Sequence, residues 1–143
     1  MIELKKGLQH GSCVDFNGKG LLILGDPRSG KSSLALACMS IGAILVGDDY
    51  IVLNTYDNKI IANNPPNISG KIEVSRVGIL NCDFIKKTKI DLVINMSEIE
   101  ISRLPKKRYI SLDNCQVSLI YGANIPNLHS IALQYFKKGF AIK

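Results

Sequence analysis

A glycine-rich segment between an apolar run and a helical pattern constrains the fold of this chain most strongly. Gly25–Ser32 reads Gly-Asp-Pro-Arg-Ser-Gly-Lys-Ser and matches the whole phosphate-binding loop pattern, GxxxxGK followed by Ser or Thr. Leu21–Leu24 before it is typical of a short buried strand, and Ser33–Ile41 after it suits a largely buried helix. A chance match or a purely structural glycine turn is the alternative, but neither explains why strand, loop and helix agree.

The loop predicts a binding site for nucleotide phosphates. Its backbone N–H groups and the positive end of the following helix would hold the phosphates. Lys31 adds a positive charge near the β- and γ-phosphates, and the Ser32 hydroxyl is placed to ligate Mg²⁺. The residues expected to bind nucleotide are Gly25, Asp26, Pro27, Arg28, Ser29, Gly30, Lys31, Ser32 and Ser33.

Two adjacent carboxylates follow the next apolar run. Asp48 and Asp49 come after Ala43–Val46, separated from Lys31 by only enough chain for one helix and one strand. An acidic residue that ends a buried strand beside a phosphate loop commonly handles Mg²⁺ or its water. Because successive strand residues point to opposite faces, one carboxylate can face the metal or a structural partner while the other faces the acceptor. The alternative is a solvated Gly-Asp-Asp turn.

Two histidines are present, and only the first lies near these motifs. His10 belongs to residues 8–16, an alternating segment that predicts a strand leading toward the phosphate loop. From such a strand the imidazole could reach the γ-phosphate region, although one histidine before a glycine says little by itself. His129 is expected to be structural or exposed.

Short strand patterns outnumber helical ones, unlike an ordinary doubly wound fold with a helix after nearly every strand. Besides the segments above, strands are expected at Ile51–Leu53, Ile60–Ala62, Leu92–Asn95, Tyr109–Leu112 and Val117–Tyr121, and a second helix at 126–138. We therefore predict an α/β fold, a single domain over residues 1–143 with a strand-rich mixed sheet.

Composition excludes several classes of protein. The 143 residues, 46% hydrophobic and 21% charged, are typical of a globular domain, and no run approaches a membrane span or a signal peptide. A soluble cytoplasmic protein is expected. The four cysteines lack paired spacing and are interpreted as isolated buried thiols.

The net charge of +6 comes from small basic clusters. These clusters are Lys86-Lys87-Lys89, Lys106-Lys107-Arg108 and Lys137-Lys138. They are interpreted as solvated faces rather than a nucleic-acid groove, because only Tyr109 supplies an interleaved aromatic ring. Their field would favour ATP or an acidic protein partner, and no membrane partner is expected.

The motifs together resemble the catalytic domain of bacterial HPr kinase/phosphorylase. His10-Gly11 and the strand that follows resemble the family's lead into its phosphate loop, and residues 41–49 resemble its segment Arg-Gly-Ala-x-Leu-Val-Ala-Asp-Asp. Residues 72–80 look like a degraded copy of its signature Leu-Glu-Ile-Arg-Gly-Leu-Gly-Ile-Ile, and Ser102–Pro105 is similar to an Arg-Leu segment. The resemblance implies a P-loop domain of the HPr kinase and PEP carboxykinase-like type, in a short form without the family's N-terminal domain.

The resemblance also implies an activity and residue roles. The activity is ATP-dependent phosphorylation of a serine on the phosphocarrier protein HPr, with phosphorolysis as the reverse reaction, in the regulation of carbohydrate metabolism. Lys31 would bind phosphates. Ser32, Glu73 and Asp48 would hold Mg²⁺. Asp49 would be the catalytic base, and His10 and Arg103 would complete the site. Related enzymes imply a homo-oligomer, a hexamer. The alternatives are a catalytically weakened nucleotide-sensing module and a small-metabolite kinase.

The sequence departs from the family pattern in three places, of which the altered signature favours the nucleotide-sensing module. Arg28 stands where the family usually has Gly, so it must avoid a left-handed backbone, accept strain, or supply an extra charge to the phosphates. In the signature, Ser75 replaces Arg and Arg76 replaces Gly. The family's later Val-Arg-Pro-Gly-Arg loop has no counterpart in residues 106–143.

Overall fold

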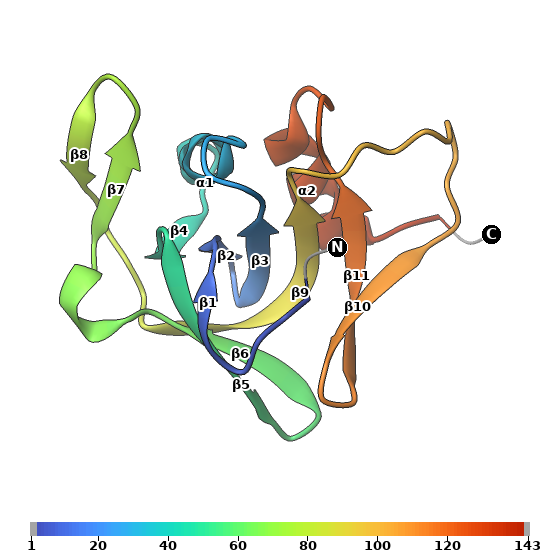
Figure 1. Cartoon of the computed structure of the whole chain (residues 1–143), viewed down its shortest axis with the longest axis horizontal. Helices are drawn as coiled ribbons and strands as arrows, with labels where there is room; N and C mark the ends of the chain where they lie inside the picture. The colour runs from blue at the N-terminus through green and yellow to red at the C-terminus, as the bar shows by residue number, and fades with distance from the viewer. Residues whose placement is uncertain (1–2, 142–143) are drawn as a thin grey trace.

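The computed structural model describes residues 3–141 and is dominated by a mixed β-sheet (Figure 1). The sheet contains β1 (Gly7–His10), β2 (Ser12–Phe16), β3 (Lys19–Leu24), β4 (Ile44–Gly47), β5 (Tyr50–Tyr56), β6 (Lys59–Asn63), β9 (Lys87–Asn95), β10 (Arg108–Leu112) and β11 (Cys115–Tyr121). Outside it lie α1 (Lys31–Ser40), the short 3₁₀ helix η1 (Pro66–Ile68), the hairpin β7 (Lys71–Val74) and β8 (Gly78–Asn81), and α2 (Leu128–Lys138). The prediction of an α/β fold rich in strands is confirmed.

Strand β9 is the centre of the sheet. The strand order is β1-β5-β6-β9-β3-β2-β4. Along one edge β9 pairs in parallel with β3, and along the other it pairs first with β6 antiparallel and then with β11 in parallel. The sheet therefore divides around β9, and the carboxyl ends of β3 and β9 meet at the edge where the phosphate loop begins (Figure 1).

The two central strands read as continuous apolar runs because both of their faces are covered. Leu21 and Ile23 of β3 pack in the core beneath α1 and α2, whereas Leu22 and Leu24 face a second core with Ile51 and other residues of β5. Both cores are fully enclosed at these positions. This double burial fixes the direction of β3 and hence the origin of the loop that follows it.

The predicted strand over residues 8–16 is wrong in one detail, because it is divided into β1 and β2 at Gly11. The Gly11 N–H donates to the Asp49 carbonyl at 2.9 Å, outside any strand ladder. A Cβ on Gly11 would lie 2.9 Å from the Ile23 carbonyl oxygen. The break turns the end of β1 toward the start of β5, where the two strands pair His10 with Tyr50.

The hairpin β7–β8 is absent from the sequence prediction, which treated residues 72–80 as one segment. Its turn is closed by the Val77 N–H, which donates to the Val74 carbonyl at 3.0 Å, and Arg76 there has a φ of 69°. Only Ile72 of the hairpin is buried, and it belongs to the core beneath α1. Figure 1 shows the hairpin projecting from the body of the sheet beside α1.

Several expectations about cysteines and charge can be compared with the described residues. Cys13, Cys38 and Cys115 are free and buried, as predicted, while Cys82 is half-buried. Burial raises the pKa of the Cys38 thiol to about 12.

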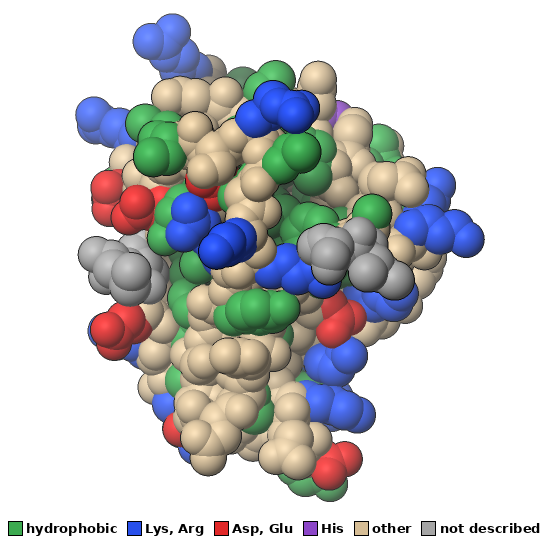
Figure 2. All heavy atoms as spheres, turned by 90° about the vertical axis from the view of Figure 1, so that its right-hand side faces the viewer, with side chains coloured by type: hydrophobic (Ala, Val, Ile, Leu, Met, Phe, Trp, Pro, Cys, Tyr) green, Lys and Arg blue, Asp and Glu red, His purple; other side chains and the backbone are tan. Residues whose placement is uncertain are grey.

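Figure 2 shows Lys and Arg side chains scattered with hydrophobic ones over one face. One of the chain's positive charges, that of Arg108, is neutralised by an ion pair with Glu100. Its guanidinium also lies 4.1 Å from the centroid of the Tyr121 ring. Among residues 3–141, no helix is both long and apolar enough to span a bilayer.

Candidate active site

The phosphate loop is tightly wound between β3 and α1. Gly25 and Gly30 have φ values of 151° and 101°, which a glycine adopts without strain. A Cβ on Gly25 would lie 2.4 Å from the Ser29 hydroxyl oxygen and 3.0 Å from the Met96 Cβ. The end of β9 braces the loop, because the Asp26 N–H donates to the Ser97 hydroxyl at 2.7 Å. Helix α1 begins at Lys31 rather than Ser33, so its N-terminus points into the loop.

Arg28 accepts strain rather than avoiding it. The side chain is exposed and its φ is 67°, a left-handed conformation that costs a non-glycine residue about 1–2 kcal/mol. We expect Arg28→Gly to stabilise the protein by about 1 kcal/mol, since glycine's own entropy offsets part of the relief. Losing the positive charge should at the same time weaken nucleotide binding modestly.

Thermal unfolding and nucleotide titration of one variant test both effects. Arg76→Gly is a matched control, because Arg76 is also exposed and has a φ of 69°, but it lies in the β7–β8 turn. Both variants should gain stability, and only Arg28→Gly should lose nucleotide affinity. A stability gain in the Arg76 variant alone would contradict the strain assigned to Arg28.

Lys31 is folded inside the loop. Its side chain is 7% exposed, and its ammonium donates to the Gly25 carbonyl at 3.0 Å and to the Asp26 carbonyl at 3.1 Å. Burial lowers the pKa of Lys31, and the charges of Asp49, Asp48 and Asp26 oppose that shift. The ammonium is therefore held by weak neutral acceptors, which a phosphate group could replace with a stronger, charge-assisted contact.

Asp48 is buried at the end of β4 and collects three hydrogen bonds. Its Oδ1 accepts from the Ser32 hydroxyl at 2.7 Å and from the Ser12 hydroxyl at 2.8 Å, and its Oδ2 accepts from the Glu73 N–H at 3.1 Å. The carboxylate thus joins the phosphate loop, β2 and the β7–β8 hairpin. Asp48 therefore connects three segments from inside the protein, and the solvated turn that the sequence left as the alternative is not formed at this residue.

Asp49 takes the opposite role. Its side chain is 65% exposed, and its Oδ1 lies 2.9 Å from the His10 Nε2. Since an ionised carboxylate only accepts, the imidazole donates its Nε2–H. The φ of Asp49 is 74°. The His10 and Tyr50 rings meet edge to face, with 5.1 Å between their centroids. One carboxylate of the pair is therefore enclosed, and the other is open to solvent.

The structure brings most of the predicted site residues together, with two differences. Glu73 contacts the site through its backbone N–H, and its side chain is exposed. Arg103 is exposed on the segment between β9 and β10, which runs away from α1 and the hairpin in Figure 1. Within residues 3–141, no hydrogen bond or ion pair links Arg103 to the other predicted residues.

Two hydroxyl residues of this site escape sequence reasoning. Ser12 is fully buried against Asp48, and its only sequence signal is a polar residue beside the apolar Cys13 and Val14. Ser97 accepts the Asp26 N–H, a contact between residues far apart in the chain that no local pattern reveals.

The loop fits a bound nucleotide with Mg²⁺. The Ser29 hydroxyl is buried inside the loop and has no hydrogen-bond partner among residues 3–141, so a donor is available where phosphate oxygens would lie. Residues 3–141 contain no cluster of three or more His, Cys, Asp and Glu arranged to hold a metal. Magnesium in phosphotransfer sites is usually bound by one or two carboxylates together with substrate phosphates, and Ser32 with Asp48 matches that donor set.

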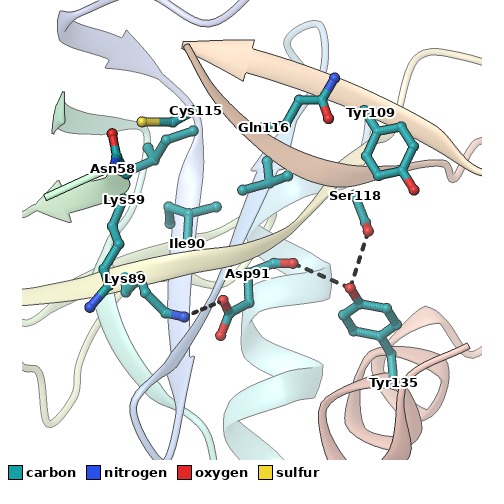
Figure 3. A pocket seen from close by; sticks show the side chains of 12 residues that line it. Asn58, Lys59, Lys89, Ile90, Asp91, Tyr109, Cys115, Gln116, Ser118 and Tyr135 are labelled. Carbon is teal, nitrogen blue, oxygen red and sulfur yellow. Dashed lines mark hydrogen bonds and ion pairs between the residues drawn. The ribbon is translucent and has the colours of Figure 1, made fainter. Parts of the chain in front are cut away.

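A separate cavity of about 320 Å³ lies away from the loop (Figure 3). It opens between the turn after β5, the first half of β9, the β10–β11 hairpin and α2. Lys89 and Asp91, both on β9, form an ion pair of 2.8 Å in its lining, and the Tyr135 hydroxyl lies 3.2 Å from that of Ser118. None of the predicted site residues lines this cavity, so the candidate active site is at the other end of β9.

Fold and site define a P-loop nucleotide-binding domain built on a strand-rich mixed sheet, of the type found in HPr kinases. The family model of the HPr Serine kinase C-terminal domain matches residues 4–133. The chain therefore belongs to the HPr serine kinase C-terminal domain family.

Individual relatives agree with this assignment. An HPr kinase/phosphorylase of Malacoplasma penetrans is 30% identical over 67% of this chain and 34% of that protein, and HPr kinase/phosphorylase 1 of Oceanobacillus iheyensis is 35% identical over 70% and 34%. The chain thus spans about a third of the length of these relatives. The HPr(Ser) kinase/phosphatase structure from Coxiella burnetii shares the fold, with a TM-score of 0.77 and 23% identity over 92% of this chain and 89% of that one.

Proposed function

We propose that this protein is an ATP-dependent kinase that phosphorylates a serine of the phosphocarrier protein HPr, and that it also removes the phosphoryl group by phosphorolysis, in which inorganic phosphate is the acceptor. The observation that carries the proposal is the exposed Asp49, held by His10 beside a complete phosphate loop. An acceptor hydroxyl can approach Asp49 from solvent, whereas Asp48 behind it is enclosed. The choice of HPr rests on the relatives, which are named HPr kinase/phosphorylase.

The chemistry assigns one task to each residue. Asp49 accepts the proton of the serine hydroxyl, the serine oxygen forms a bond to the γ-phosphorus, and the bond between the γ-phosphorus and its bridging oxygen breaks to release ADP. In phosphorolysis an oxygen of inorganic phosphate forms a bond to the phosphorus of phosphoserine, and the bond between that phosphorus and the serine oxygen breaks. The protonated Asp49 returns its proton to the serine oxygen, and pyrophosphate is released. His10 keeps the carboxylate oriented through its 2.9 Å contact. Phosphoryl transfer needs positioning and charge neutralisation more than covalent catalysis.

The phosphate side of the reaction belongs to the loop. Lys31 and the amides of Gly25–Ser33 hold the phosphates, and Ser32 with Asp48 would hold Mg²⁺, which neutralises phosphate charge when bound. Arg103 remains a proposed site residue only if its exposed segment moves or meets another copy of the chain. Assembly into a hexamer is part of the same proposal, and analytical ultracentrifugation would test it.

Transfer of label from γ-labelled ATP to purified HPr, with Mg²⁺ present, tests the proposal directly. Label on a serine of HPr is the expected result. ATP binding without label on HPr would overturn the kinase assignment and favour a nucleotide sensor, which the replaced signature residues Ser75 and Arg76 support. Label on a small metabolite instead of HPr would identify a metabolite kinase.

A further inference from the structure

A buried hydroxyl to which the sequence motifs assign no role contacts the centre of the site. Ser12 lies on β2, is fully buried, and donates to Asp48 Oδ1 at 2.8 Å. No other hydrogen bond is formed by this hydroxyl among the described residues. A serine in an otherwise apolar buried strand needs such a partner, because an unpaired buried hydroxyl is costly.

The contacts of Asp48 limit what its carboxylate can still do. Each carboxylate oxygen offers about two lone-pair sites. Oδ1 uses both of its lone-pair sites, because it accepts hydrogen bonds from the Ser12 and Ser32 hydroxyls. Oδ2 uses one of its two sites to accept a bond from the Glu73 N–H. Asp48 can therefore take one further partner, through Oδ2, and has no free site on the oxygen that faces the phosphate loop.

The Ser32 hydroxyl is oriented by this arrangement. Because its proton points to Asp48, its oxygen lone pairs are turned away from Asp48 and are free for another ligand. A hydroxyl that ligates a cation must present a lone pair and place its proton elsewhere. Asp48 provides the place for that proton, and Ser12 restrains Asp48 from the opposite side.

We propose that Ser12 is a positioning residue that fixes Asp48, so that the Ser32 hydroxyl presents a lone pair to the Mg²⁺ of bound nucleotide. The inference rests on the proposed function, because it requires nucleotide bound with Mg²⁺. Ser12 itself touches neither ligand. Its effect is expected to be confined to the metal, since in the described part of the chain the Ser12 hydroxyl forms no hydrogen bond with Lys31 or the loop amides.

The chain contains a matched pair for comparison. Thr88 on β9 donates its buried hydroxyl to the Asp15 carboxylate on β2, so a second buried hydroxyl–carboxylate bond exists in the same sheet. Asp15 also accepts the Gly18 N–H at 3.0 Å and has no contact with the phosphate loop. Thr88→Val therefore removes the same kind of bond without touching the site.

The test measures the affinity of a non-hydrolysable fluorescent ATP analogue with Mg²⁺ and again with EDTA. The dissociation constant in EDTA divided by the dissociation constant with Mg²⁺ reports how much the metal strengthens binding. Ser12→Ala should reduce this ratio by about 10-fold, the size typical of residues that orient metal ligands, with little change in EDTA. Thr88→Val should leave the ratio unchanged although its melting temperature falls.

Each outcome decides the inference. A wild-type ratio retained by a folded Ser12→Ala variant would overturn the role of Ser12 while leaving nucleotide binding intact. Absence of Mg²⁺-dependent binding in the wild-type protein would overturn the proposed function and the inference with it. If Ser12→Ala fails to fold, Ser12→Cys decides, because it retains the volume with a weaker donor. A Cys variant with the wild-type ratio would contradict the proposal, and a reduced ratio would support it.

Discussion

Replacing Asp49 with Asn should lower phosphoryl transfer to HPr by about 10²–10⁴-fold, the usual contribution of a general base. The amide oxygen of Asn can still accept the His10 Nε2–H, so the side chain keeps its position but cannot take the serine proton. Asn also tolerates the φ of 74° at this position, which most residues do not. Nucleotide affinity should change little, because the phosphate loop does not depend on Asp49 for a hydrogen bond.

Asp57→Asn is the control for this substitution. Asp57 is exposed and has a φ of 53° in the turn between β5 and β6. Asp57→Asn therefore removes the same charge as Asp49→Asn, also from a residue with a left-handed backbone. Transfer from γ-labelled ATP and fluorescence titration of nucleotide should be measured on both variants. Full transfer by Asp49→Asn would show that Asp49 is not the base.

Lys31→Ala should abolish detectable transfer and weaken ATP binding by about 10–100-fold. The expected loss is that of one charge-assisted hydrogen bond, worth about 1.5–3 kcal/mol. In the free protein the ammonium bonds only to the Gly25 and Asp26 carbonyls, which are loop groups beside the expected phosphates. Isothermal titration calorimetry with ATP measures the affinity, and the transfer assay measures activity.

Lys19→Ala controls for the loss of a lysine that bonds to the backbone. The Lys19 ammonium donates to the Phe136 carbonyl at 2.9 Å, between β3 and α2 and away from the phosphate loop. This variant should bind ATP like the wild-type protein. Unchanged ATP affinity in Lys31→Ala would contradict the assignment of the loop as the nucleotide site.

Local patterns were sufficient for most of the fold. Leu21–Leu24 and Leu92–Asn95 were each predicted to be strands, and the glycine-rich loop predicted the helix after it; that the two strands pair at the centre of the sheet was not predicted. The hairpin β7–β8 was missed because its turn has Arg76 at the left-handed position, where glycine or asparagine would have signalled a turn.

The site was predictable where residue type and chain spacing carry the chemistry. Lys31, Asp48 and Asp49 are of this kind, and the structure brings them together with His10. Ser12 and Ser97 could not be found, because their partners Asp48 and Asp26 are distant in the chain and are brought to them by tertiary packing. Arg103 stays a prediction from resemblance alone.

The pairing of β3 with β9 has a consequence for the order in which the protein folds. The strand that ends in the phosphate loop lies early in the chain, yet its parallel neighbour comes only after the whole of β4 to β8. Parallel pairing across so long a loop is slow to form, because the entropy of closing the loop precedes any gain from contacts. During synthesis the segment up to residue 86 has no β9 beside it, so the phosphate loop lacks its neighbouring strand until that late part of the chain has left the ribosome.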